Sequence, residues 1–148
     1  MIINGNALLA AKPLSPMIGK KVREHGVSHG LGEAGYDIRI KQQITLTAQS
    51  RFSLASTLEK FSMPTSLVGV VHDKSTWARK GLSVFNTVIE PGWRGWLTLE
   101  LVYHGNDQLT IPAGCGIAQV LFHKLAQKAE YGDGKYQDQP NAPIGARE

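Results

Sequence analysis

The chain has 148 residues, which fits one domain and is long enough to bury a core without disulfides. Hydrophobic residues make up 42% and charged residues 19%, an ordinary balance for a globular protein. The net charge of +4 suits an anionic small ligand as well as nucleic acid. The single cysteine, Cys115, excludes an intramolecular disulfide and a four-sulfur zinc site, and it favours a reducing, cytoplasmic setting.

Neither a membrane nor a nucleic-acid partner is expected. The first residues, Met1–Asn6, contain no basic stretch leading into an apolar core, so no signal peptide is expected. No apolar run approaches the length that spans a bilayer. The cluster Lys20–Arg23 has no interleaved aromatic residues, which favours a solvated surface over a nucleic-acid patch.

The N-terminal part is predicted to be helical. Asn6 is a candidate cap for a short helix over Ala7–Ala11 that ends near Pro13. One or two further helical turns are expected over Ser15–His25. A loop should follow, because it contains four glycines: Gly26, Gly30, Gly32 and Gly35.

From Tyr36 onward the pattern predicts strands. Charged and apolar residues alternate over Tyr36–Lys41, which is the period of a half-buried strand. Further strands are expected over Ile44–Ala48, Arg51–Thr57, Leu67–His72, Leu82–Ile89, Leu97–His104, Gln108–Ile111 and Ile117–Lys124. Turn residues such as Pro91-Gly92 separate them. Many short, closely spaced strands predict an all-β sandwich, jelly roll or closed barrel.

The chain is expected to divide into a β domain over residues 1–126 and a polar tail over residues 127–148. The tail is rich in glycine and proline and has little to bury, so it is expected to be mobile. Its polar and aromatic residues suit a segment that closes over a ligand, and a frayed terminus without a function is the alternative.

Glu100 lies in Trp96–Tyr103, a predicted strand that is otherwise mostly apolar. A carboxylate in such a strand is costly unless it is paired or functional. Two interpretations remain open. Glu100 is either half of a buried ion pair with Arg79, or a general base whose pKa is raised by burial.

Lys74-Ser75-Thr76 follows a predicted strand and offers a cation, two hydroxyls and backbone N–H groups. These groups form either a phosphate cradle or an ordinary polar connection. The glycine spacing of a Walker A loop is absent. Asp37 lies on a predicted strand, and Glu90 lies beside the Pro91-Gly92 turn. Each carboxylate has either a structural or a functional role.

No zinc site is expected. Zinc-dependent nucleobase deaminases need a histidine or cysteine together with two further cysteines. Cys115 is alone, and no histidine pair has H-x-x-x-H spacing on a plausible helix, since Gly26 interrupts His25–His29. The histidines are His25, His29, His72, His104 and His123. A G-x-S-x-G nucleophile elbow and a G-x-G-x-x-G dinucleotide loop are also absent.

Short polar blocks occur in a fixed order along nearly the whole chain. They are Ala34–Ile40, Phe52–Glu59, Pro64–Gly69, Asp73–Leu82, Ile89–Gly95, Leu99–Leu101, Ile111–Gln119 and Gly134–Gln139. Together this ordered set resembles the dCTP deaminase and dUTPase superfamily, and most closely its dCTP deaminase branch. The resemblance implies a distorted jelly-roll β-barrel of the dUTPase-like type with a short N-terminal helix. It also implies a homotrimer with active sites between subunits, and Mg²⁺ carried on the triphosphate.

The resemblance implies specific roles by position. Glu100 matches the glutamate that activates water, and Ser75 with Arg79 matches the pair that orients that water and the base. The nucleotide-contacting positions are matched by Lys74, Thr76, Glu90, Trp93, Tyr131, Lys135 and Gln139. Asp37 matches an aspartate that, in dUTPases, helps to hold the waters of the metal. The implied reaction is zinc-independent conversion of dCTP to dUTP and ammonia.

Three departures from the family pattern keep two alternatives open. The segment Ser83–Ile89 is shorter than the base-recognising hairpin of the family. Glu90 stands where the family has aspartate, and Ala34–Asp37 looks more like the first motif of dUTPases. The alternatives are a dUTP or dCTP pyrophosphatase, including a bifunctional deaminase–dUTPase, and a non-catalytic nucleotide-binding trimer.

Overall fold

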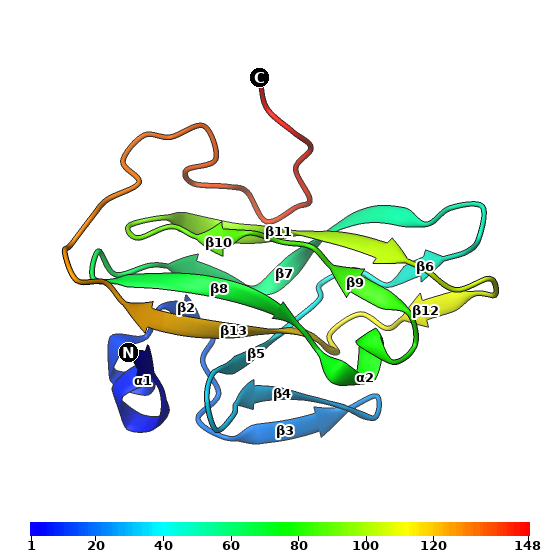
Figure 1. Cartoon of the computed structure of the whole chain (residues 1–148), viewed down its shortest axis with the longest axis horizontal. Helices are drawn as coiled ribbons and strands as arrows, with labels where there is room; N and C mark the ends of the chain where they lie inside the picture. The colour runs from blue at the N-terminus through cyan, green and yellow to red at the C-terminus, as the bar shows by residue number, and fades with distance from the viewer.

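The computed structural model describes all residues from Met1 to Glu148, and it confirms the all-β prediction with a short N-terminal helix (Figure 1). The elements are β1 (Ile2–Ile3), α1 (Gly5–Ala11), β2 (Leu14–Ser15), β3 (Lys21–Glu24), β4 (Val27–Leu31), β5 (Tyr36–Arg39), β6 (Ile44–Leu46), β7 (Phe52–Ser62), β8 (Leu67–Asp73), α2 (Ser75–Ala78), β9 (Leu82–Val84), β10 (Val88–Ile89), β11 (Arg94–Tyr103), β12 (Leu109–Ile111) and β13 (Gly116–Lys124). Neither helix has the length and apolar character to cross a membrane.

The strands form two main sheets. The larger is seven-stranded, with the order β10-β8-β13-β5-β4-β3 and β1 also paired to β13. The smaller is four-stranded, with the order β2-β7-β11-β9, and β12 pairs with β6 separately. The run predicted as one strand, Leu82–Ile89, is therefore two: β9 belongs to the smaller sheet and β10 to the larger. The chain crosses between the sheets at residues 85–87.

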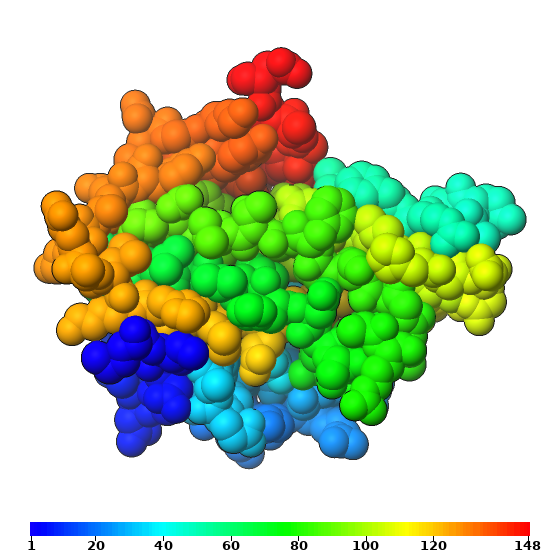
Figure 2. All heavy atoms as spheres, in the orientation of Figure 1, coloured from blue at the N-terminus to red at the C-terminus, as the bar shows by residue number.

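The core lies between the sheets and determines which side chains face outward. On β11, Leu99 and Leu101 are fully buried in the core cluster of 27 residues. Because side chains alternate along a strand, Thr98 and Glu100 point to the opposite, outer face of the smaller sheet. That outer face is where the C-terminal tail lies (Figures 1 and 2).

The helix predicted over Ser15–His25 is wrong, because part of that segment is the first strand of a hairpin. Strand β3 pairs antiparallel with β4, and Glu24 faces Val27 across a two-residue turn. His25 and Gly26 have φ of 52° and 75°, and positive φ at both positions is the geometry that two-residue hairpins favour. Only Val22 of β3 is half-buried, so the short charged run carried no clear strand period and the turn at His25-Gly26 was the missed signal.

Helix α1 begins two residues earlier than predicted, at Gly5 instead of Ala7, and helix α2 was not predicted. The N-cap of α1 is Asn4 rather than Asn6, and its side chain makes no capping hydrogen bond. Lys12 ends the helix in the left-handed conformation, with φ of 46°. Helix α2 is a single turn after Lys74, too short for its sequence to carry a helical period.

A largely buried ion pair joins Arg39 on β5 to Glu59 on β7, and the Glu59 side chain is fully buried. Arg39 Nε lies 2.9 Å from Glu59 Oε1, and the Arg39 backbone N–H donates to Glu59 Oε2 at 3.0 Å. Burial raises the pKa of the Glu59 carboxyl, and the bonds from Arg39 partly oppose that rise. This pair ties β5 of the larger sheet to β7 of the smaller one.

Replacing Arg39 by Leu should destabilise the fold by about 3–5 kcal/mol at neutral pH, because Glu59 is left buried without a cation. Loss of Arg39 raises the pKa of Glu59 further, so protonation relieves the penalty and the deficit shrinks as pH falls. Denaturant unfolding of both proteins at several pH values measures this. A deficit that is equal at every pH would contradict the prediction.

Candidate active site

A cavity of about 600 Å³ opens on the outer face of the smaller sheet, between β11, the segment 86–90 and the tail. Its wall is formed by Phe52, Leu54, Asn86, Thr87, Val88, Ile89, Glu90, Trp93, Leu97, Thr98, Glu100, Tyr131, Tyr136, Gln139, Ile144, Gly145 and Ala146. Ten of these 17 residues are hydrophobic, and Glu90 and Glu100 are the charged ones. An apolar wall with a few polar groups is typical of a small-molecule site.

Glu100 is half-buried in this wall and has no cation beside it. Its carboxylate takes part in none of the ion pairs or side-chain hydrogen bonds of the chain, so the pair with Arg79 is not formed within one copy. Burial raises the pKa of the Glu100 carboxyl above its ordinary value. A raised pKa brings a carboxylate closer to the range in which it both accepts and donates a proton.

Asn86 and Thr98, which sequence reasoning missed, complete the polar part of the wall. The Asn86 side chain bonds the backbone of β11 at Thr98 and Glu100. Thr98 Oγ1 donates to Gln139 Oε1 at 3.3 Å and accepts from the Ile144 N–H at 3.1 Å. The asparagine within a β-rich run was the signal that could have drawn attention to this position.

The tail is bonded to the turn that leads into β11. Trp93 Nε1 donates to the Tyr136 carbonyl at 2.6 Å, and Arg94 pairs with Asp138 at 3.0 Å. Gln139, only 8% exposed, forms a parallel bridge with Gly95. The tail thereby forms one wall of the cavity, whereas its mobility and its closure over a ligand stay predictions.

Of the ten site residues predicted from sequence, five lie together in this cavity. They are Glu90, Trp93, Glu100, Tyr131 and Gln139. Lys135 lies in the tail but outside the wall, where its Nζ donates to the Arg147 carbonyl and sits 5.4 Å from the Tyr136 ring centroid.

The four predicted residues around α2 do not line the cavity: Lys74, Ser75, Thr76 and Arg79. Figure 1 shows α2 at the lower edge of the molecule, on the side away from the tail. Ser75, Thr76 and Arg79 are exposed there. Lys74 is half-buried and pairs with Asp37 at 2.5 Å, and Ser28 Oγ lies 3.1 Å from its Nζ.

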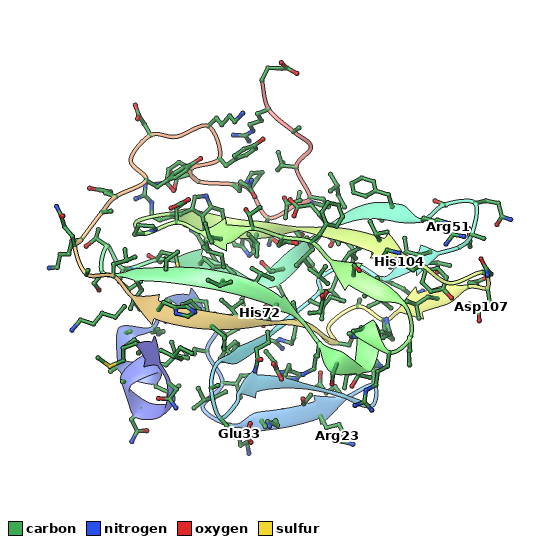
Figure 3. The ribbon with its side chains drawn as sticks, in the orientation of Figure 1. Arg23, Glu33, Arg51, His72, His104 and Asp107 are labelled. Atoms are coloured by element: carbon green, nitrogen blue, oxygen red, sulfur yellow. The ribbon has the colours of Figure 1, made fainter.

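No group of three or more histidine, cysteine, aspartate or glutamate side chains is arranged to hold a metal ion. Two of the histidines are labelled in Figure 3, His72 on β8 and His104 after β11, and they lie on different parts of the molecule. Cys115 is fully buried, and burial raises the pKa of its thiol to about 11.

Comparison with known proteins defines the fold and then the family. The EIAV dUTPase superposes with a TM-score of 0.59 at 19% identity, over 82% of this chain and 98% of that one. A dCTP deaminase from Agrobacterium tumefaciens superposes with a TM-score of 0.62 at 16% identity, over 83% of this chain and 48% of that one. The protein is therefore a β-barrel of the dUTPase-like class, as the resemblance implied.

The sequence identifies the family within that class. Residues 35–125 match the family described as dCTP deaminase-like. A dCTP deaminase from Protochlamydia amoebophila is 33% identical over 88% of this chain and 89% of its own length. One from Helicobacter pylori is 31% identical over 85% of both chains. This chain belongs to the dCTP deaminase-like family.

Replacing Gly95 by Ala should release the tail. A Cβ at Gly95 would lie 2.6 Å from the Gln139 nitrogen, and its φ of 140° is unfavourable for any other residue. The overpacking should weaken docking enough to speed tryptic cleavage after Lys135 by about tenfold.

Gly114→Ala is the matched control, because its φ of 81° is also positive but no atom lies within 4 Å of the added Cβ. Cleavage after Lys135 should stay at the wild-type rate in that variant. Equal acceleration in both variants would mean that general strain, rather than contact with Gln139, is responsible.

Proposed function

We propose that this protein deaminates dCTP to dUTP and ammonia. The observation that carries the proposal is an unpaired glutamate, Glu100, with a raised pKa in the wall of an apolar cavity. Membership in the dCTP deaminase-like family and the dCTP deaminases similar over most of the chain support it. A cytoplasmic location is part of the proposal and rests on the single free cysteine.

The chemistry needs one carboxylate that changes its protonation state. Water attacks C4 of cytosine while the Glu100 carboxylate takes one of its protons and passes it to N3, forming a neutral tetrahedral centre. Glu100 then moves the proton of the new C4 hydroxyl to the amino group, the C4–N bond breaks, ammonia leaves and the C4 carbonyl of dUTP forms. In this mechanism no metal-bound hydroxide is required, because positioned donors supply the remaining stabilisation.

The cavity wall supplies no cation for a triphosphate, since its charged members are Glu90 and Glu100. A triphosphate needs charge-assisted hydrogen bonds from lysine or arginine, and Mg²⁺ bound to it neutralises part of its charge. We infer that α2 of a second copy completes the site in a homotrimer. Ser75 and Arg79 would then orient water and base, while Lys74 and Thr76 contact phosphate.

The remaining contacts in this proposal come from the tail and from the turn before β11. Trp93 and Tyr131 pack beside the nucleotide. The Glu90 carboxylate accepts a hydrogen bond from the sugar hydroxyl, and the amide group of Gln139 faces the nucleotide. Lys135 reaches a phosphate when the tail closes. Lys74, which pairs with Asp37, would be shared between that carboxylate and the phosphate, and Asp37, only 5% exposed, would help to hold waters of the metal.

A second candidate is hydrolysis of dUTP or dCTP to the monophosphate and pyrophosphate, alone or after deamination. Two observations favour it. The exposed carboxylate of Glu90 lies in the same cavity as Glu100 and has no ion-pair partner. The fold is also that of dUTPases. Incubation with each deoxynucleoside triphosphate and Mg²⁺, reading ammonia and pyrophosphate separately, distinguishes the two reactions from binding without turnover.

Glu100→Gln should lower ammonia release from dCTP by about 10²-fold or more, because glutamine cannot take the proton from water. Nucleotide affinity should stay near wild type, since the side chain keeps its size. In the wild-type protein kcat/KM should fall as pH falls through the raised pKa of Glu100, above the usual range near 4.3. Full ammonia release by the variant would remove Glu100 as the base.

Mixing two inactive variants tests whether the site is shared between copies. Glu100→Gln and Arg79→Ala should each be inactive, and mixed oligomers should recover activity because some sites combine an intact Glu100 with an intact Arg79. Ammonia release is measured after subunit exchange, with mass spectrometry confirming mixed oligomers. The double variant mixed with either single variant is the control and should stay inactive. Mixed oligomers without recovery would contradict a shared site.

A further inference from the structure

The segment that follows β9 stops pairing with β11 opposite Glu100. At that point the Asn86 side chain forms a hydrogen bond to β11. Strand β9 pairs with β11 from Tyr103 to Leu101, and the Phe85 N–H extends this pairing to the Glu100 carbonyl at 3.1 Å. In a regular antiparallel ladder the Glu100 N–H would donate back to the Phe85 carbonyl. It donates instead to Asn86 Oδ1, at 3.0 Å.

The second half of the Asn86 amide bonds the next group along the same edge. Asn86 Nδ2 donates to the Thr98 carbonyl at 2.7 Å. The backbone N–H and C=O groups of Asn86 and Thr87 make no hydrogen bond to β11. One side-chain amide, with its donor and its acceptor, thus takes the place of the missing main chain.

This substitution has a consequence for the cavity. The main chain at residues 86 and 87 is free to turn away toward β10 of the larger sheet, while β11 keeps its hydrogen bonds at Thr98 and Glu100. The space that the main chain vacates is part of the cavity, whose wall includes Asn86, Thr87 and Glu100. Oδ1 and Nδ2 of Asn86 each already bond β11, so the orientation of the amide is fixed by the strand.

We propose that Asn86 is a positioning residue that holds the backbone of Glu100 and thereby aims its carboxylate into the cavity. The proposal rests on the proposed function for its kinetic consequence, but not for its structural one. Without the amide, the Glu100 N–H and the Thr98 carbonyl lose their partners, and strand β11 can shift toward or away from the crossing segment. A displacement of the base by about 1 Å is enough to cost about 10²-fold in rate.

The test uses two substitutions at Asn86 and the same two at Asn6, an exposed residue of α1 whose side chain makes no hydrogen bond. Asn86→Ala should lower kcat for ammonia release by about 10²-fold and leave KM within about twofold of wild type. Asn86→Asp keeps an acceptor for Glu100 but adds a negative charge beside it, which raises the pKa of Glu100. The acid limb of its pH profile should therefore move to higher pH.

Asn6→Ala and Asn6→Asp should match wild type in kcat, KM and pH profile. A merely structural role for Asn86 would lower the melting temperature but leave kcat per folded molecule and the acid limb unchanged, and that result overturns the proposal. If Asn86→Ala does not fold, the pH profile of Asn86→Asp still tests the proposal.

Failure of the proposed function is distinguishable from failure of this inference. A wild-type protein that releases ammonia from no nucleotide would refute the proposed function alone. The Glu100 carboxyl is then titrated by NMR in wild type, Asn86→Asp and Asn6→Asp. A higher pKa in Asn86→Asp only, with faster amide exchange at Glu100, supports the positioning role. An unchanged pKa with unchanged exchange overturns it.

Discussion

Strand β11 must have its backbone hydrogen bonds satisfied along both edges, and the candidate site depends on how this is achieved. One edge pairs with β7 along most of its length, with an irregularity between Trp96 and Thr98. The other edge pairs with β9 only as far as Glu100, where the chain crosses to the larger sheet. The tail bonds Trp96 beyond that point. The cavity is the gap between these two partners, and a side-chain amide keeps β11 bonded there.

The charges of the site are divided between two faces of the molecule. The cavity contains carboxylates in an apolar wall, which raises the pKa of Glu100 and leaves a triphosphate without a cation. The cations and hydroxyls that the family resemblance assigns to phosphate and water lie on α2, away from the tail. This division supports the proposal of a site completed by another copy, because the cavity has no cation in its wall and α2 presents lysine and arginine.

Sequence periodicity predicted the strands whose residues alternate in polarity, such as Tyr36–Arg39, and a lone carboxylate in a mostly apolar strand pointed to Glu100, as half of an ion pair or as a general base. It failed at Lys21–Glu24, where short charged runs suit a helix or a hairpin equally and the turn at His25-Gly26 decides. The role of Asn86 was not predictable, because its bonds depend on where the chain leaves one sheet for the other. Docking of the tail likewise depends on contacts between segments far apart in sequence.

The most direct test of the central claim is a crystal structure of the Glu100→Gln variant with dCTP and Mg²⁺. C4 of cytosine should lie within hydrogen-bond reach of the substituted side chain, directly or through one water. Ser75 and Arg79 of a second copy should contact the same nucleotide. A nucleotide bound elsewhere, with position 100 facing only protein atoms or open solvent, would exclude Glu100 as the base.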